Sequence, residues 1–233
     1  EEGDLTRLVR NHEHFAAAKS VEQVICKTWI VLIQNLLSDR WEARHGAASA
    51  LASLVKVCRQ SSAATKSHQV LDKVLEDIIV RCLCVLGMDR FGDYSSDNVV
   101  APVRESCAQL LAICASGPHL PIVTGLICDM TREVSASVIK ASNIRTVTLW
   151  GRRYAGLLAS KYILVGTDCP ETWAALLPLA TKILLKESKK NMNRAKVLTD
   201  SPIFNDDIRR AAAEVLVTAA RKHSQQAAIP SED

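Results

Sequence analysis

A short pattern built around an arginine occurs four times along this chain of 233 residues. The four arginines are separated by 60, 49 and 56 residues: Arg44, Arg104, Arg153 and Arg209. Three residues after each arginine stands a small side chain: Ala47, Cys107, Gly156 and Ala212. Seven residues after, three of the four segments carry leucine, and the third carries Ser160. Recurrence at such a period is typical of chains that repeat one supersecondary unit.

The spacing inside each segment is helical, and an amphipathic helix is expected before each one. Apolar residues at steps of three and four in the windows 21–36 and 70–86 support this reading. Only 9 glycines and 4% aromatic residues argue against a sheet protein. The sequence therefore predicts an all-α fold, a HEAT-type α-solenoid of about four antiparallel helix pairs. Because the usual HEAT period is about 40–47 residues, these repeats are expected to carry long inter-helix loops.

We divide the chain into a weakly anchored segment 1–20, a HEAT-repeat array 21–223 and a frayed tail 224–233. The expected loops are 61–67, 87–97, 166–171 and 186–205. Within the array, the repeated arginines are expected to be structural, bridging to acidic residues or carbonyl groups of the adjacent repeat. Trp41 and Trp150, at matching helix starts, are expected to pack as wedges rather than to bind a partner.

The eight cysteines do not form a metal-binding pattern, since only Cys82 and Cys84 approach a close pair. We expect buried, reduced thiols and no metal. The net charge of +4 is small for this length and does not by itself indicate that the chain binds nucleic acid. His45 has no nucleophile or carboxylate around it in the sequence, so no catalytic residues are predicted.

Three blocks resemble a known family in order and composition. They are Trp41-Glu-Ala-Arg-His-Gly-Ala-Ala48; Asp89-Arg-Phe-Gly-Asp-Tyr94, followed by 99–109; and the residues Trp150, Arg153, Gly156, Leu157, Leu158, Lys161 and Tyr162. Together they are similar to the N-terminal HEAT array of the modifier-of-transcription family. The third block departs from that family's pattern at Gly151 and Tyr154.

The resemblance implies a function and a cellular location. Members of that family are Swi/Snf-type ATPases that bind the TATA-binding protein and remove it from DNA. This chain lacks the G-x-x-x-x-G-K-[ST] phosphate loop, so it would be a non-catalytic targeting region in the nucleus. It would need no cofactor, because ATP and magnesium would belong to a motor elsewhere. The partner would be the TATA-binding protein, with DNA contacted through the complex.

The segment around Phe91 is the first candidate partner-binding site. It combines charged and aromatic side chains between two expected helices: Asp89, Arg90, Phe91, Asp93 and Tyr94. Solenoids often bind partners through such loops. The alternative is that Phe91 and Tyr94 fold back and seal the core.

A basic stretch near the C-terminus is the second candidate. Its members are Lys186, Lys189, Lys190, Arg194 and Lys196. They could contact DNA phosphates, although the default interpretation is a solvated loop. Two other functions therefore remain open beside the family reading, a HEAT scaffold of another assembly and a solenoid that binds DNA directly.

Overall fold

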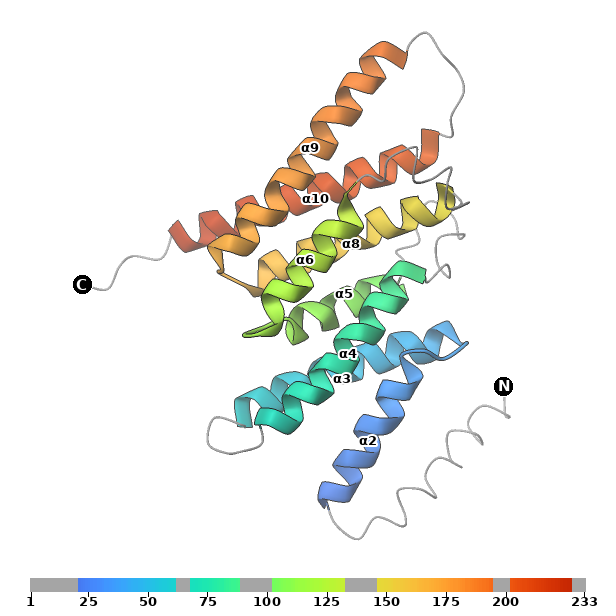
Figure 1. The fold of residues 1–233 in the computed structure, drawn as a ribbon, viewed down its shortest axis with the longest axis vertical. Helices are drawn as coiled ribbons and strands as arrows, with labels where there is room; N and C mark the ends of the chain where they lie inside the picture. The colour runs from blue at the N-terminus through green and yellow to red at the C-terminus, as the bar shows by residue number, and fades with distance from the viewer. Residues whose placement is uncertain (1–20, 62–67, 89–101, 133–145, 195–201, 228–233) are drawn as a thin grey trace, which may run out of the picture.

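The computed structural model is all-helical over the residues that it describes, which are 21–61, 68–88, 102–132, 146–194 and 202–227. Eight helices occupy these ranges (Figure 1). They are α2 (Val21–Asn35), α3 (Trp41–Ser61), α4 (His68–Met88), α5 (Pro102–Cys114), α6 (His119–Thr131), α8 (Thr146–Gly166), α9 (Pro170–Arg194) and α10 (Pro202–Ala227). None of the described residues forms a strand, as the composition predicts.

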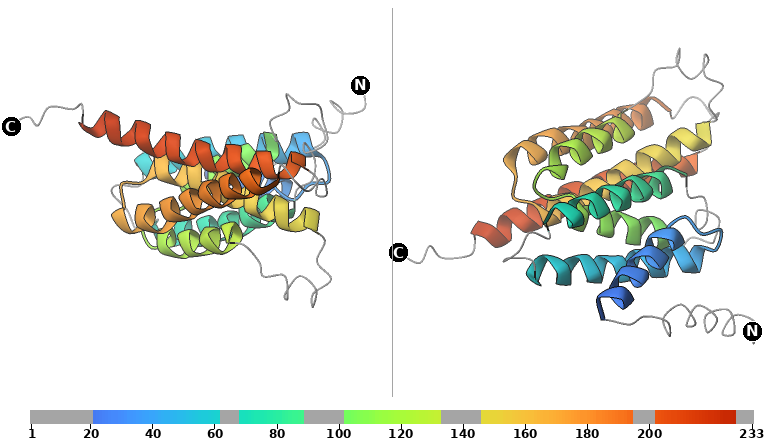
Figure 2. Two further views of the ribbon diagram at one scale, coloured as in Figure 1. Left: turned by 90° about the horizontal axis from the view of Figure 1, so that it is seen from above. Right: turned by 60° about the horizontal axis from the view of Figure 1, so that its bottom comes forward.

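The helices pack as four consecutive pairs, α2 with α3, α4 with α5, α6 with α8, and α9 with α10. The second helix of each pair carries a repeated arginine, and these four helices lie side by side in the order α3, α5, α8, α10. The first helices of the pairs cover one side of that layer (Figure 2). This arrangement is a HEAT-type array, which confirms the predicted fold class.

The small residue after each arginine lies where helices meet. Ala47, Cys107, Gly156 and Ala212 are all buried. The closest approach is at Gly156 on α8, where an added Cβ would stand 2.5 Å from Thr131 Oγ1 and 3.0 Å from the Thr131 backbone nitrogen. The end of α6 can therefore lie against α8 only because residue 156 has no side chain.

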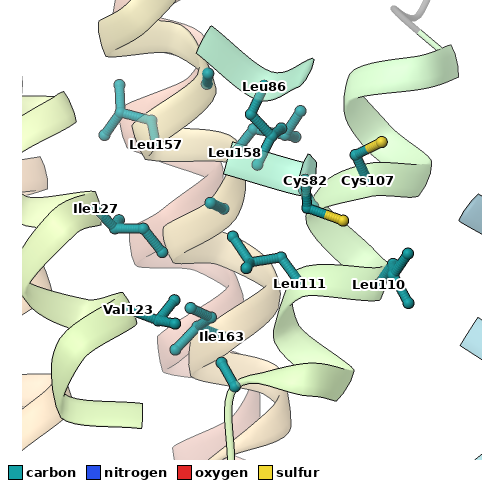
Figure 3. Close-up of a cluster of buried hydrophobic side chains, with 14 of the residues drawn as sticks. Cys82, Leu86, Cys107, Leu110, Leu111, Val123, Ile127, Leu157, Leu158 and Ile163 are labelled. Atoms are coloured by element: carbon teal, nitrogen blue, oxygen red, sulfur yellow. The ribbon is translucent and has the colours of Figure 1, made fainter. Parts of the chain in front are cut away.

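The leucine position two turns after the arginine fills the shared core. Leu51 and Leu111 are fully buried, and Leu111 lies between Cys82 and Ile163 in Figure 3. Leu216, at this position in the fourth repeat, is partly buried against the same core. Ser160, the exception in the third repeat, is also buried, and its hydroxyl donates to the Gly156 carbonyl at 2.8 Å. The local hydrogen bond satisfies a polar group that would otherwise be costly in the core.

Two of the expected loops differ from the structure. Only residues 167–169 separate α8 from α9, so the predicted loop 166–171 is shorter than expected. The predicted loop 186–205 is wrong for its first nine and its last four residues, because α9 continues as a helix to Arg194 and α10 begins at Pro202. Lysine and glutamate are good helix formers, and neither glycine nor proline interrupts the end of α9.

The side chains expected to be buried divide into two groups. Cys82, Cys107, Cys114 and Cys128 are buried free thiols, as predicted, whereas the free thiols Cys58, Cys84 and Cys169 are only half-buried. Trp41, in contrast, is 42% exposed at the start of α3 and is a poor wedge. The side chain of Trp150 lies outside the described residues. Helix α10 extends to Ala227, and the limits proposed for the array, 21 and 223, stay predictions.

Candidate protein-interaction site

The connections between the two helices of each pair share one edge of the array. The first helices of the pairs run in one direction and the second helices return, so the end of each first helix meets the start of its partner at this edge (Figure 1). We call these helix ends the turn edge: Asn35 and Trp41, Met88 and Pro102, Thr131 and Thr146, and Arg194 and Pro202. Segments attached to this edge would present one continuous row of contacts.

The first predicted site, Asp89, Arg90, Phe91, Asp93 and Tyr94, lies outside the described residues. Its two neighbours are described, since Met88 ends α4 and Pro102 begins α5. Both belong to the turn edge. Met88, the last described residue before the candidate segment, is 68% exposed.

The repeated arginine of the first pair donates hydrogen bonds to the turn that connects α2 with α3. Arg44 is buried, and its Nη1 donates to the carbonyl oxygens of Ser38 at 2.6 Å and Asp39 at 3.1 Å. Both acceptors lie in the turn between α2 and α3. The prediction of carbonyl acceptors is confirmed, but these two belong to the arginine's own repeat and not to the adjacent one.

The repeated arginine of the second pair reaches across to its neighbour. Arg104 on α5 is 2% exposed, and its Nη2 would stand 3.1 Å from a Cβ placed on Gly151 of α8. Gly151 is one of the two departures from the family's pattern, and its missing side chain leaves room for the guanidinium. The planar guanidinium of arginine suits such a buried position between helices.

A lysine joins three of the arginine-bearing helices. Lys161 Nζ on α8 lies 3.6 Å from Glu105 Oε1 on α5 and 3.2 Å from Glu214 Oε2 on α10. Burial raises the pKa of Glu105, and the nearby Lys161 ammonium opposes this shift only in part. The charges of the cluster lie against one another, so we assign it to contacts between the helices of the array rather than to a partner.

Two basic residues that the sequence analysis did not single out cap helices of other repeats. Lys222 on α10 donates to the carbonyl oxygens of Leu164, Val165 and Thr167 near the end of α8, at 3.2, 3.0 and 2.7 Å. Arg59 on α3 donates to Ile113 and Cys114 at the end of α5. A basic residue near the end of its own helix was the only sequence signal for these caps. The carbonyl groups that accept the hydrogen bonds cannot be identified from the sequence, because they belong to the backbone.

His45 and two of the buried thiols contribute to the packing between helices of the array. His45 Nδ1 lies 3.2 Å from Ser106 Oγ and joins α3 to α5. A hydrogen bond with Cys107 and burial raise the pKa of the Cys82 thiol well above its usual value, and burial raises that of Cys114 to about 12. No group of three or more metal-ligating side chains occurs among the described residues. Searching the same residues finds no helix with the length and hydrophobicity to cross a membrane.

The second predicted site falls on a helix. Lys186, Lys189, Lys190 and Arg194 belong to the last part of α9, whereas Lys196 lies outside the described residues. The structure thus places four of the five on one element at the turn edge, without describing their side chains.

Fold and site together define a HEAT-type helical-repeat array, a class of protein whose repeated helices form an extended surface for partners. The chain is homologous over most of its length to the TATA-binding protein-associated factors. It is 35% identical over 193 residues to TATA-binding protein-associated factor 172 of Homo sapiens, covering 80% of this chain and 9% of that protein. It is 29% identical over 200 residues to TATA-binding protein-associated factor mot1 of Aspergillus fumigatus, covering 82% of this chain and 10% of the relative.

A shorter stretch is more similar still. Over 88 residues, 35% of this chain and 5% of the relative, it is 48% identical to TATA-binding protein-associated factor MOT1 of Saccharomyces cerevisiae. The chain therefore spans no more than about a tenth of the length of these relatives. No family model matches the sequence, and no solved structure matches it.

Proposed function

We propose that this chain is a non-catalytic HEAT scaffold that binds the TATA-binding protein, as the targeting region of a nuclear ATPase that removes that protein from DNA. The supporting observation is the homology over most of the chain to proteins named TATA-binding protein-associated factors. The motor, with its ATP and magnesium, would lie outside this chain.

The architecture is compatible with a passive grip. The arginine-bearing helices are fastened to one another by buried side chains and by contacts such as Lys161 with Glu105 and Glu214. A rigid layer of this kind pays little ordering cost when it binds. The contacts would come from Asp89, Arg90, Phe91, Asp93 and Tyr94, which in the sequence follow the last residue of α4 and precede the first residue of α5.

Direct binding tests the proposal. Purified chain is titrated into labelled TATA-binding protein, with and without TATA-containing DNA, after circular dichroism has shown that the chain is helical. Saturable binding in both arms is expected. A helical, cooperatively melting chain that does not bind in either arm would overturn the proposal in favour of a HEAT scaffold of another assembly.

A further inference from the structure

Helix α9 extends well past the helix beside it. Thr124 Oγ1 on α6 lies 3.5 Å from Thr172 Oγ1 on α9, and the Cys128 thiol lies 3.9 Å from the Ala175 carbonyl oxygen. These two contacts set α6 and α9 parallel, with Thr131, the last residue of α6, level with Pro178 or Leu179. About fifteen residues of α9, or ~23 Å at 1.5 Å per residue, therefore lie beyond the end of α6 (Figure 1).

The same stretch loses the apolar stripe that holds α9 in the array. Leu176, Ala180 and Ile183 are buried at helical spacing. The next positions of that stripe are Glu187, Lys190 and Arg194. A helix that is polar on every side has no apolar face to pack against its own fold. The surface of this part of α9 can therefore bind a partner.

The end of α9, which begins with the last buried position of the stripe at Ile183, also has a net charge as large as that of the whole chain. Residues 182–194, which we call the overhang, contain five basic residues and one acidic residue. Their net charge of +4 equals that of the full sequence, so the rest of the chain is electrically balanced. Lys182, whose side chain is described, is exposed. We propose that the overhang binds the phosphate backbone of duplex DNA, without reading its sequence.

Helix stability alone does not account for this arrangement. Cations near a helix C-terminus favour the carbonyl end, but the effect is confined to the last turn. Lys182 and Lys186 stand twelve and eight residues before Arg194, beyond that reach. Like charges four residues apart repel on a helix, as do Lys182 with Lys186 and Lys186 with Lys190. A polyanion would turn this repulsion into attraction.

The composition favours a phosphate backbone over other anionic partners. A protein interface has an apolar core with charges at its rim, and beyond Leu185 the overhang has one large apolar residue, Met192. Single-stranded nucleic acid is bound by stacking on aromatic side chains, and the overhang has none. A duplex offers one phosphate per strand every ~3.4 Å of its axis, enough to engage several cations along one helix.

The test compares two variants with the same loss of charge. One carries Lys186→Gln, Lys189→Gln and Lys190→Gln in the overhang. The control carries Lys56→Gln, Lys73→Gln and Arg221→Gln, three exposed cations on α3, α4 and α10. Fluorescence anisotropy with a labelled duplex that lacks a TATA sequence gives the affinity of the full chain from about 50 to 200 mM salt.

We expect wild type and control to share a steep salt dependence, and the overhang variant to lower the slope of log K against log salt by about 2 to 3. Its affinity for the TATA-binding protein without DNA should stay unchanged, which separates this inference from the proposed function. Equal losses in both variants, or no binding by wild type, would overturn the inference. Binding of an acidic polyglutamate peptide as tightly as the duplex would overturn it in favour of an acidic protein surface.

Discussion

At the scale of single residues, packing between repeats depends on glycines, which let helices approach closely, as much as on large buried side chains. Gly156 admits the end of α6, and Gly151 admits the guanidinium of Arg104. Gly125 of α6 is not constrained in this way, since a Cβ there would meet no atom within 4 Å. Substitution by alanine should therefore lower the stability of the chain at Gly156 and raise it at Gly125.

Gly156→Ala is expected to destabilise the chain by about 1–3 kcal/mol, because the new methyl group overlaps the Thr131 backbone. Gly125→Ala, the matched control, should stabilise it by up to about 1 kcal/mol through helix propensity. Urea unfolding followed by circular dichroism gives both values. Equal effects of the two substitutions would refute the close approach of α6 to α8.

Glu105→Gln tests the half-buried carboxylate beside Lys161. Because burial raises the pKa of Glu105, its ionised form is disfavoured in the folded chain, and this cost appears as the pH rises through the folded-state pKa. The variant should melt above wild type near pH 7, and the difference should shrink as the pH falls toward 4.5, the ordinary value. A difference that is constant across this range would mean that the carboxylate is not perturbed.

At the scale of helices, the repeats are joined by caps that cross from one repeat to another. Lys222 Nζ reaches three carbonyl oxygens near the end of α8, lies 2.7 Å from Asp168 Oδ1, and stands 5.7 Å from the centre of the Trp173 ring. One ammonium group thus touches residues of α8, of the following turn and of α9 from its place on α10. Arg59 joins α3 to α5 in a similar way.

Lys222→Met keeps most of the aliphatic stem and removes the charged donor. Leaving the carbonyl groups at the end of α8 without it is expected to cost about 1–3 kcal/mol. Arg221→Met, one residue earlier and exposed, is the control and should change stability by less than about 0.5 kcal/mol. Thermal melting of the two variants decides the matter, and an unchanged melting temperature for Lys222→Met would show that the cap is dispensable.

The order and type of the helices could be predicted from the sequence because their signal is side-chain periodicity. The arginines and the small residues after them predicted the four helices α3, α5, α8 and α10. The end of α9 was wrongly predicted as a loop because its residues lack an apolar stripe, although lysine and glutamate sustain a helix. The acceptors of Arg44 and Lys222 could not be assigned, because a backbone carbonyl is the same at every position.

At the scale of the whole molecule, the helices that flank or carry the two proposed binding elements all have ends at the turn edge. One of these elements is the predicted partner-binding segment between α4 and α5, and the other is the cationic overhang at the end of α9. In the account proposed here, the first binds the TATA-binding protein and the second binds the DNA on which that protein sits. A scaffold with both contacts would place its partner and the DNA in a defined relation for a separate motor.

The most direct test of the central claim is the affinity of the chain for the TATA-binding protein, measured for wild type and for Phe91→Ala with Tyr94→Ala. A control with Val80→Ala and Ile122→Ala removes two apolar side chains that are 58% and 66% exposed on α4 and α6. We predict saturable wild-type binding, at least tenfold weaker binding by the Phe91 and Tyr94 variant, and nearly unchanged binding by the control, with all three melting alike. Equal affinity of the three proteins would contradict binding through this segment. A large drop in melting temperature for the Phe91 and Tyr94 variant would instead indicate that these two side chains pack in the core.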